Sequence, residues 1–470
     1  MSAYPTITVA EPFPAPHAGH AENEALRVCQ LRDIRTVECA LSDLASVARG
    51  KIQTTAEFSE QRGTRLPSII FGTTVVGGEP RSVYEDLIPC TYPDVALTPD
   101  WATFAPDPLI AHRATVLCDV GGGFTTPKGI AVEAAALSPR SILKRVLKRL
   151  DERGLAALVA PELEFFLVAI PGARHGTSLP PAPSPFHPNV RESFIDIFSL
   201  ERTSAFEPFF TTLFAACRAQ RIPVTGFSHE AAASQYEVNF APAAPLAQAD
   251  AVFRFKRLAR DVALRYGFAA TFLAKPYVEG PGSGMHWHMS MQHRDSGRNV
   301  FSGADGAASA ELLAFVAGMQ RHALATTALI APYQNSYMRF QKHEAAPAAA
   351  SWGQDDRSVA FRIPVSNAAN RRIENRLPGA DANPYLLLAS MIAAGLDGME
   401  HQLSPTAEPD PLPLSLDAAL QAFRHDDWTR ALFGAQFVDT YAALKGHELA
   451  QREQAPSGLE WDIANLLHHA

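Results

Sequence analysis

The stretch Pro161-Glu162-Leu163-Glu164-Phe165-Phe166 lies inside a strand-like apolar run over residues 158–168 and places two acidic side chains within it. Because successive side chains of a strand point to opposite faces, Glu162 and Glu164 share one face, and the apolar residues beside them share the other. Two carboxylates next to so much apolar surface are costly unless a cation compensates them. An edge strand with one solvated face would also accommodate them, so the pair alone leaves both interpretations open.

The same alternation of charged side chains recurs further along the chain. The recurrences are His286 and His288 in residues 284–290, Glu230 and Glu237 around a loop-to-strand passage, and Arg372, Glu374 and Arg376 in residues 371–376. Each recurrence alone is typical of a solvated surface or of a structural histidine. Together they predict an α+β protein with a sheet whose concave face carries five carboxylates, two imidazoles and several guanidinium groups.

The residue types on this face indicate the kind of ligand that it holds. A set dominated by oxygen donors, with two histidines and no cysteine, suits Mg²⁺ or Mn²⁺ better than a structural zinc ion. Divalent ions beside arginines are typical of phosphoryl transfer, because cations neutralise phosphate oxygens and arginines bind the spreading charge. The sequence has no Walker A or GxGxxG motif, and Gly121-Gly122-Gly123 predicts only a turn because Phe124 follows it. A nucleotide is therefore expected on the sheet, beside the metals.

The composition excludes several broad classes of protein. With 470 residues, 47% hydrophobic and 19% charged, the chain has material for two or three folded domains of about 150 residues each. A net charge of −8 argues against a nucleic-acid partner, and no apolar run reaches the roughly 18 residues that a membrane span needs. The five cysteines are scattered without CxxC spacing, which favours a reducing compartment. We therefore expect a soluble, cytoplasmic protein.

Turn signals and shifts in composition divide the chain into three segments. Residues 1–21 form a Pro/Ala-rich flexible tail that lacks the features of a targeting signal. Residues 22–110 form a small α+β domain that ends in a Pro- and Asp-rich stretch, and residues 111–470 form the remainder. Helices are expected over residues 22–31, 139–153, 206–220 and 249–266. Ser138 and Pro139 are typical of the start of the second of these helices.

Six blocks of the sequence resemble the glutamine synthetase family. The blocks are residues 161–166, His229-Glu230 with residues 235–237, Lys275-Pro276 with residues 282–286, residues 335–339, residues 357–364, and residues 371–374 leading into residues 382–385. Their order and spacing match from about residue 36 to the C-terminal end of the sequence. The resemblance implies a β-grasp N-terminal domain and a larger catalytic domain with a curved antiparallel sheet. It also implies a ring-shaped homo-oligomer, commonly a double hexamer (a homododecamer), with active sites at subunit boundaries.

The same resemblance implies roles for individual residues. One metal would be held by Glu164, Glu230 and Glu237, and another by Glu162, His286 and Glu374, with two or three Mg²⁺ or Mn²⁺ ions per site. Glutamate and the transferring phosphate would be bound by Gly282, Arg339, Arg357 and Arg376. The co-substrate ATP would be bound by His288, Ser290 and Arg362. The catalytic residues would be Arg357 and the flap residue Glu344, which stands one position earlier than the amine-deprotonating glutamate of glutamine synthetases.

The reaction that the resemblance implies has two steps. The γ-carboxylate of L-glutamate attacks ATP to give γ-glutamyl phosphate, and an amine then displaces phosphate. Metals and arginines stabilise the developing charge, and closure of the site excludes water that would hydrolyse the acyl phosphate.

Departures from glutamine synthetases bear on the identity of the amine. Glutamine synthetases carry an Asp that helps to bind ammonium, whereas residues 69–78 contain no acid at the corresponding place. Gly280-Pro281-Gly282 is another departure, because the family usually has Asn before the last glycine. Blocks that look closer to γ-glutamylputrescine and γ-glutamylpolyamine synthetases are residues 271–277, 339–341, 350–353 and 379–385. A di- or polyamine is therefore the expected substrate, and the residue that would bind its distal ammonium is not identified.

Other interpretations stay open at the level of the sequence. The amine could be ethanolamine or another alkyl- or arylamine, or it could be ammonium itself. The chain could also be a structural ring protein without activity, or a module that binds polyamines without turnover. These last two predict broken metal ligands, whereas all six matching positions keep Glu or His.

Overall fold

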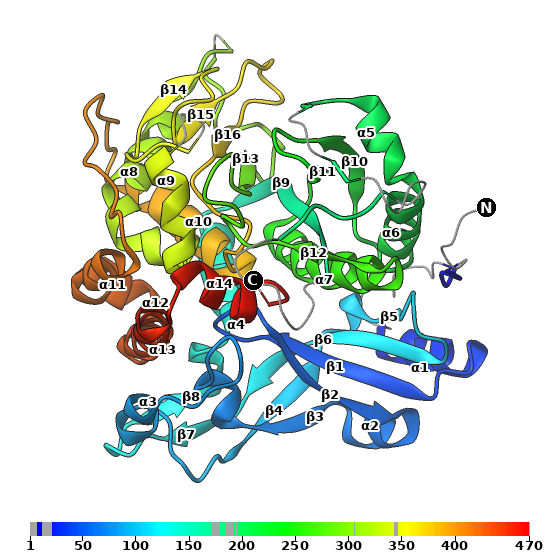
Figure 1. Cartoon of the computed structure of the whole chain (residues 1–470). Helices are drawn as coiled ribbons and strands as arrows, with labels where there is room; N and C mark the ends of the chain where they lie inside the picture. Colours follow the sequence, from blue (N-terminus) through cyan, green and yellow to red (C-terminus); the bar gives the residue numbers. More distant parts are fainter. Residues whose placement is uncertain are drawn as a thin grey trace.

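The two structural units of the protein are seen in the computed structural model, which describes residues 7–11, 21–170, 179–184, 191–192, 196–304, 306–342 and 346–469 (Figure 1). The N-terminal unit, coloured blue to cyan, lies below a larger unit that is built around the long teal strand β9 (Leu155–Ala169). The α+β class expected from the sequence is confirmed. Among the described residues, no helix is both long enough and apolar enough to cross a membrane.

The N-terminal unit is a mixed sheet with strand order β2-β1-β6-β4-β3 and with β5 paired to β6. Its strands are β1 (Thr36–Ser42), β2 (Ala48–Thr54), β3 (Thr64–Pro67), β4 (Asp94–Pro99), β5 (Ala105–Pro106) and β6 (Arg113–Gly121). Its helices are α1 (Ala21–Leu31), α2 (Thr55–Gln61) and α3 (Arg81–Asp86), and a hairpin of β7 (Gly123–Thr125) and β8 (Ala131–Glu133) follows. The helix expected over residues 22–31 is thus confirmed as α1.

The N-terminal unit extends further along the chain than the sequence indicated. Residue 110 was the expected boundary, whereas β6 begins at Arg113 and pairs in parallel with β1, Thr36 opposite Arg113 and Ala40 opposite Leu117. A parallel pair has no local turn that would announce it in the sequence, because its strands are joined by a long connection. We therefore propose that the boundary lies at the short 3₁₀ helix Ala134–Ala136.

Helix α4 (Pro139–Asp151) joins the two units through a buried arginine. As expected, the helix starts with Pro139, and the Ser138 hydroxyl accepts from the backbone N–H of Ser141 at 3.4 Å. Arg140 is 3% exposed and donates to three carboxylates, at 2.5 Å to Asp119 of β6, at 2.6 Å to Asp100 and at 2.9 Å to Asp250. Because a buried charge is costly without partners, this set of ion pairs fixes how the units meet.

The larger unit contains a curved sheet with strand order β10-β11-β9-β13-β16-β15-β14 and with β12 paired to β9. Besides β9, its strands are β10 (Val224–His229), β11 (Gln235–Phe240), β12 (Phe268–Thr271), β13 (Met285–His293), β14 (Trp352–Gln354), β15 (Phe361–Ile363) and β16 (Ile373–Asn375). Neighbouring strands are antiparallel except β14 and β15. Strand β9 is therefore an interior strand, which excludes the edge-strand interpretation of Glu162 and Glu164.

The two faces of β9 differ as the alternation of its sequence predicts. Leu163, Phe165 and Leu167 are fully buried, and the ring of Phe165 packs at 5.4 Å from that of Phe272. On the other face, the Glu162 side chain is 31% exposed and the Glu164 side chain 13% exposed. The carboxylates thus lie on the partly exposed face of the sheet and not in the core.

Helices make up most of the rest of the larger unit. They are α5 (Leu200–Ala205), α6 (Glu207–Ala219), α7 (Pro245–Arg265), α8 (Ala310–Ile330), α9 (Met338–Lys342), α10 (Pro384–Glu400), α11 (Leu416–His425), α12 (Asp427–Phe433), α13 (Ala435–Gln454) and α14 (Gly458–Leu466). Helices α6 and α7 confirm the two helices expected over residues 206–220 and 249–266. Helices α8 and α10 touch at Gly318, where a Cβ atom would lie 2.0 Å from the carbonyl oxygen of Ala394. Only glycine permits this approach of the two backbones.

Candidate active site

The predicted acidic face lies at the centre of the larger sheet. Glu162 on β9 stands opposite His286 on β13, and Glu164 stands opposite Glu237 on β11. His288 on β13 stands opposite Glu374 on β16. Pairing in these registers brings residues from distant parts of the sequence onto one face, where cross-strand neighbours are close enough to interact.

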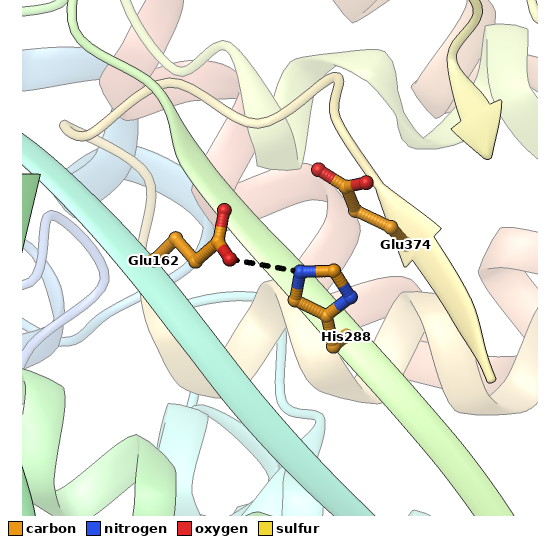
Figure 2. A group of neighbouring side chains, drawn as sticks. All are labelled: Glu162, His288 and Glu374. Carbon is orange, nitrogen blue, oxygen red and sulfur yellow. Dashed lines mark hydrogen bonds and ion pairs between the residues drawn. The ribbon is translucent and has the colours of Figure 1, made fainter. Parts of the chain in front are cut away.

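Glu162, His288 and Glu374 come from three adjacent strands and point toward one another (Figure 2). The Nε2 atom of His288 lies 3.1 Å from the Glu162 carboxylate. The Nδ1 atom of His286 lies 3.8 Å from Glu162 and 3.9 Å from Glu374, and its Nε2 atom lies 3.9 Å from Glu164. Both imidazoles therefore stand among the carboxylates, as the alternation of residues 284–290 predicted.

Two groups of side chains are compact enough to hold an ion each. Within each group the candidate ligand atoms lie within 4.8 Å of one another, and the groups are Glu162 with His288 and Glu374, and Glu162 with Glu237 and His286. This grouping differs from the expected ligand sets, because Glu162 belongs to both groups and His288 was expected at the ATP. Glu164 and Glu230 lie outside both groups. The division of the six expected ligands between separate ions therefore stays a prediction.

The donor set fits a divalent cation. Burial, and then the charge of Glu164, raises the pKa of Glu230 to about 7, and burial together with Glu162 and Glu164 raises the pKa of Glu237 to about 8. Carboxylates that repel one another in this way are typical of sites whose charge a bound cation balances. Carboxylate oxygens with one or two imidazoles are ligands that suit Mg²⁺ or Mn²⁺.

Glu374 is held by two arginines. Arg362 on β15 donates to Glu374 at 2.8 Å and to Asp355 at 2.5 Å, and Arg376 donates to the other carboxylate oxygen of Glu374. Burial alone would raise the pKa of Glu374, but His286, His288 and these arginines hold it below its usual range. Arg362, expected at the ATP, is thus also in contact with a candidate metal ligand.

The remaining expected residues surround this cluster. Arg339 is 5% exposed and donates to the carbonyl of Leu377 at 2.9 Å, and a Cβ atom at Gly282 would lie 2.8 Å from its Cγ. Ser290 follows His288 by two residues on β13 and so shares its face. Arg357 is exposed, and its carbonyl accepts from Arg376 at 3.1 Å. Glu344 lies outside the residues that the structure describes.

Several residues of the site had no role assigned from the sequence. The amide of Gln235 donates to Glu164 at 3.2 Å and to the carbonyl of Gly282 at 2.9 Å, and so joins β9 to the loop before β13. The N–H of Gly284 donates to Glu164 at 2.8 Å, and Arg372 donates to Nδ1 of His288 at 3.3 Å. Gln235 precedes Glu237 by two residues on β11, and this shared strand face is the signal that could have identified it.

Comparison with known proteins gives matches along nearly the whole chain. The family model for the catalytic domain of glutamine synthetase matches residues 136–464. Gamma-glutamylputrescine synthetase PuuA of Escherichia coli (strain K12) is 33% identical in an alignment 449 positions long that covers 91% of this chain and 92% of that protein. A glutamate–isopropylamine ligase of a Pseudomonas species is 30% identical, over 95% of this chain and 99% of that protein. A glutamine synthetase of Mycobacterium bovis is 32% identical, over 90% of this chain and 94% of that protein.

Solved structures show the same fold. The crystal structure of a novel glutamine synthase homolog has a TM-score of 0.77 and 26% sequence identity, and covers 92% of this chain and 98% of its own. The structure titled apo GmaS without ligand has a TM-score of 0.76 and 25% identity, and covers 93% of this chain and 97% of its own. The similarity thus includes both the N-terminal unit and the larger unit.

Proposed function

This chain belongs to the glutamine synthetase family, and we propose on that premise that it joins the γ-carboxylate of L-glutamate to a di- or polyamine. The reaction would consume ATP and proceed through γ-glutamyl phosphate. The chain is an ATP-dependent carbon–nitrogen ligase, and its relatives are named as a γ-glutamylputrescine synthetase, a glutamate–isopropylamine ligase and a glutamine synthetase.

One observation carries the proposal. Glu162, His288 and Glu374 converge from three strands, and Arg362 and Arg376 both contact Glu374. A face that combines carboxylates able to hold divalent cations with arginines able to bind anions is suited to phosphoryl transfer from a nucleotide. Bound cations would neutralise phosphate oxygens of ATP. A structural ring protein would not need this charge arrangement, and it is disfavoured for that reason.

Different residues of the site would bind glutamate, the transferring phosphoryl group and ATP. Arg339, which is buried beside Gly282, would bind a carboxylate of glutamate, and Arg376, which contacts Glu374, would bind the transferring phosphoryl group. His288 and Ser290 would contact the phosphates of ATP. Arg357, exposed at the rim, would reach the phosphoryl group when the site closes and excludes water. Glu344 would accept the proton of the attacking amine.

The amine is the finer part of the proposal. Residues 69–78 provide no carboxylate as a counter-charge for ammonium, and the smaller side chains there would leave room for a carbon chain. Relatives named for putrescine and for isopropylamine both match over at least 91% of this chain. The isopropylamine relative supports a second candidate, a monoalkylamine such as isopropylamine or ethanolamine, in place of a di- or polyamine.

We further propose a homo-oligomeric ring, which light scattering coupled to gel filtration tests directly.

The deciding experiment is phosphate release from ATP with glutamate and Mg²⁺ across a panel of amines. The panel contains ammonium, putrescine, cadaverine, spermidine, spermine, ethanolamine and isopropylamine, with glutamate omitted as the blank. Strong turnover with the di- and polyamines and little with ammonium is the expected result. A preference for ammonium would make the protein a glutamine synthetase, and a preference for isopropylamine or ethanolamine would favour the second candidate.

A further inference from the structure

A chain of buried polar contacts runs from the last helix of the structure to the loop that carries Gly282. This chain, the C-terminal relay, consists of Arg452, Asp462, Asn335 and Lys275. Helix α14 contributes Asp462, and its Leu466 packs in a cluster with Ala45 and Val75 of the N-terminal unit and with Leu273 and Tyr333 of the larger one. The helix therefore lies at the junction of the two units (Figure 1).

The relay begins with a bidentate ion pair. Arg452 on α13 donates to the Asp462 carboxylate at 2.7 Å and 2.9 Å, and Asp462 has no exposed surface. The same carboxylate accepts from the Asn335 amide at 3.2 Å. Charge-assisted, two-point contacts of this kind fix orientation as well as position. Asp462 on α14 thereby fixes the orientation of the Asn335 side chain.

Asn335 in turn holds both backbone groups of Lys275. Its Oδ1 atom accepts from the Lys275 N–H at 2.7 Å, and its Nδ2 atom donates to the Lys275 carbonyl at 2.9 Å. Asn335 and Lys275 are both fully buried, so a lost partner would leave an unpaired polar group in the interior. The Lys275 ammonium donates to the carbonyl of Gly280, and so Lys275 reaches across the loop formed by residues 275–284.

That loop and the segment after Asn335 both carry residues of the site. Within the loop, the carbonyl of Gly282 accepts from Gln235, and the N–H of Gly284 donates to Glu164. Arg339 follows Asn335 by four residues, in the helix α9 that succeeds the 3₁₀ turn Gln334–Tyr337. Asn335 therefore connects the two elements expected to bind glutamate: it is bonded to the 275–284 loop, and it lies just before helix α9, which carries Arg339.

We infer that Asp462 is a positioning residue, which acts through Asn335 to hold the 275–284 loop and Arg339 in the glutamate-binding arrangement. The Asp462 carboxylate is bonded to Asn335 and Arg452, and neither of these is an expected substrate-binding residue. The effect on glutamate rests on the proposed function, whereas the effect on the order of the loop does not.

The test compares Asp462→Asn with Glu460→Gln, a substitution of an exposed carboxylate on the same helix. Because Asp462 is buried, Arg452→Gln serves as a second variant that weakens the relay from the more exposed side. Hydrogen exchange of the backbone amides of the non-proline residues in 276–284 is measured for all three variants and the parent chain. In parallel, KM for glutamate and KM for ATP are measured with the best amine of the panel.

Loss of one charge-assisted hydrogen bond corresponds to roughly a tenfold change in the equilibrium between the ordered loop and its locally opened state. We expect Asp462→Asn and Arg452→Gln to speed exchange in residues 276–284 about tenfold and to raise KM for glutamate by a similar factor, with KM for ATP within about twofold. Glu460→Gln should resemble the parent chain. Unchanged exchange in the loop, or equal changes in both KM values, would overturn the inference. Absence of glutamate-dependent turnover in the parent chain would count against the proposed function, and the exchange data would still decide on the relay.

Discussion

Glu237 on β11 stands directly opposite Glu164 on β9, so the sheet holds two carboxyl groups as a cross-strand pair. Pairs of this kind are destabilising, and neighbouring carboxylates resist full ionisation. At neutral pH the repulsion is relieved either by a proton on Glu237, whose pKa is raised to about 8, or by a bound cation.

Removal of a candidate metal ligand should abolish turnover and leave the fold intact. Glu230→Ala should lower the rate of glutamate-dependent ATP turnover by at least about a hundredfold, because cation-assisted stabilisation of phosphoryl transfer contributes several kcal/mol. Activity is measured by phosphate release and assembly by light scattering. Glu201→Ala, at an exposed glutamate of α5, serves as the control and should keep parent activity. An active, assembled Glu230→Ala protein would remove Glu230 from the site.

Stabilisation by Mg²⁺ should increase with pH. The folded-state pKa values of Glu230 and Glu237 are raised from 4.5 to about 7 and about 8, so the metal-free protein loses their contribution to stability as pH rises through that range. Mg²⁺ competes with the same protons, and at a hundredfold excess over its Kd it should stabilise by about 2.7 kcal/mol.

The measurement is the difference in thermal midpoint between Mg²⁺ and EDTA, followed from about pH 6 to about pH 8.5. The difference should widen with pH in the parent chain and change less in Glu237→Gln, which cannot ionise there. A difference that is constant over this range would show that neither carboxylate competes with the ion.

The junction of the two units should depend on Arg140. Arg140→Ala leaves the carboxylates of Asp100, Asp119 and Asp250 without their shared partner, so we expect a loss of about 3–5 kcal/mol in the free energy of unfolding. Urea unfolding measures the loss. Lys148→Ala on the same helix removes an exposed pair with Glu152 and should cost no more than about 0.5 kcal/mol. Similar losses in both variants would mean that the buried set contributes no more than a surface pair.

The contact between α8 and α10 should admit glycine alone. Gly318→Ala would place a Cβ atom 2.0 Å from the Ala394 carbonyl oxygen, and the forced separation of the helices should cost about 1–3 kcal/mol. Gly446→Ala in α13, where a Cβ would meet open space, should instead stabilise by about 0.5–1 kcal/mol. Thermal unfolding of the two variants should therefore shift in opposite directions, and a shared direction would contradict the steric argument.

The sequence alone predicted those features of the site that follow from local periodicity. The spacing of Glu162 and Glu164 predicted a shared strand face, and the same rule placed His286 beside His288, because alternation is a property of a single strand. The contact of Arg362 with Glu374 joins two separate strands, and no spacing in the sequence announces it. The relay through Asn335 is likewise absent from any local pattern, since its partners come from a loop and the last helix.

The boundary of the N-terminal unit shows the same difference between local patterns, which the sequence reveals, and distant contacts, which it does not. Turn-rich composition marked residue 110, but the unit ends only after β6 has paired with β1. Composition reports where the chain is irregular, whereas the membership of a strand in a sheet depends on partners far away in the sequence. For this reason the class of fold could be predicted and the boundary could not.

The parallel pairing of β1 with β6 also constrains the order of events during synthesis on the ribosome. At roughly 5–20 residues per second, several seconds pass between the emergence of β1 and that of β6. During this interval the hairpin of β1 and β2 has an open edge, because the strand that will cover it has not been made. The nascent chain therefore exposes a bare strand edge to neighbouring polypeptides at that stage.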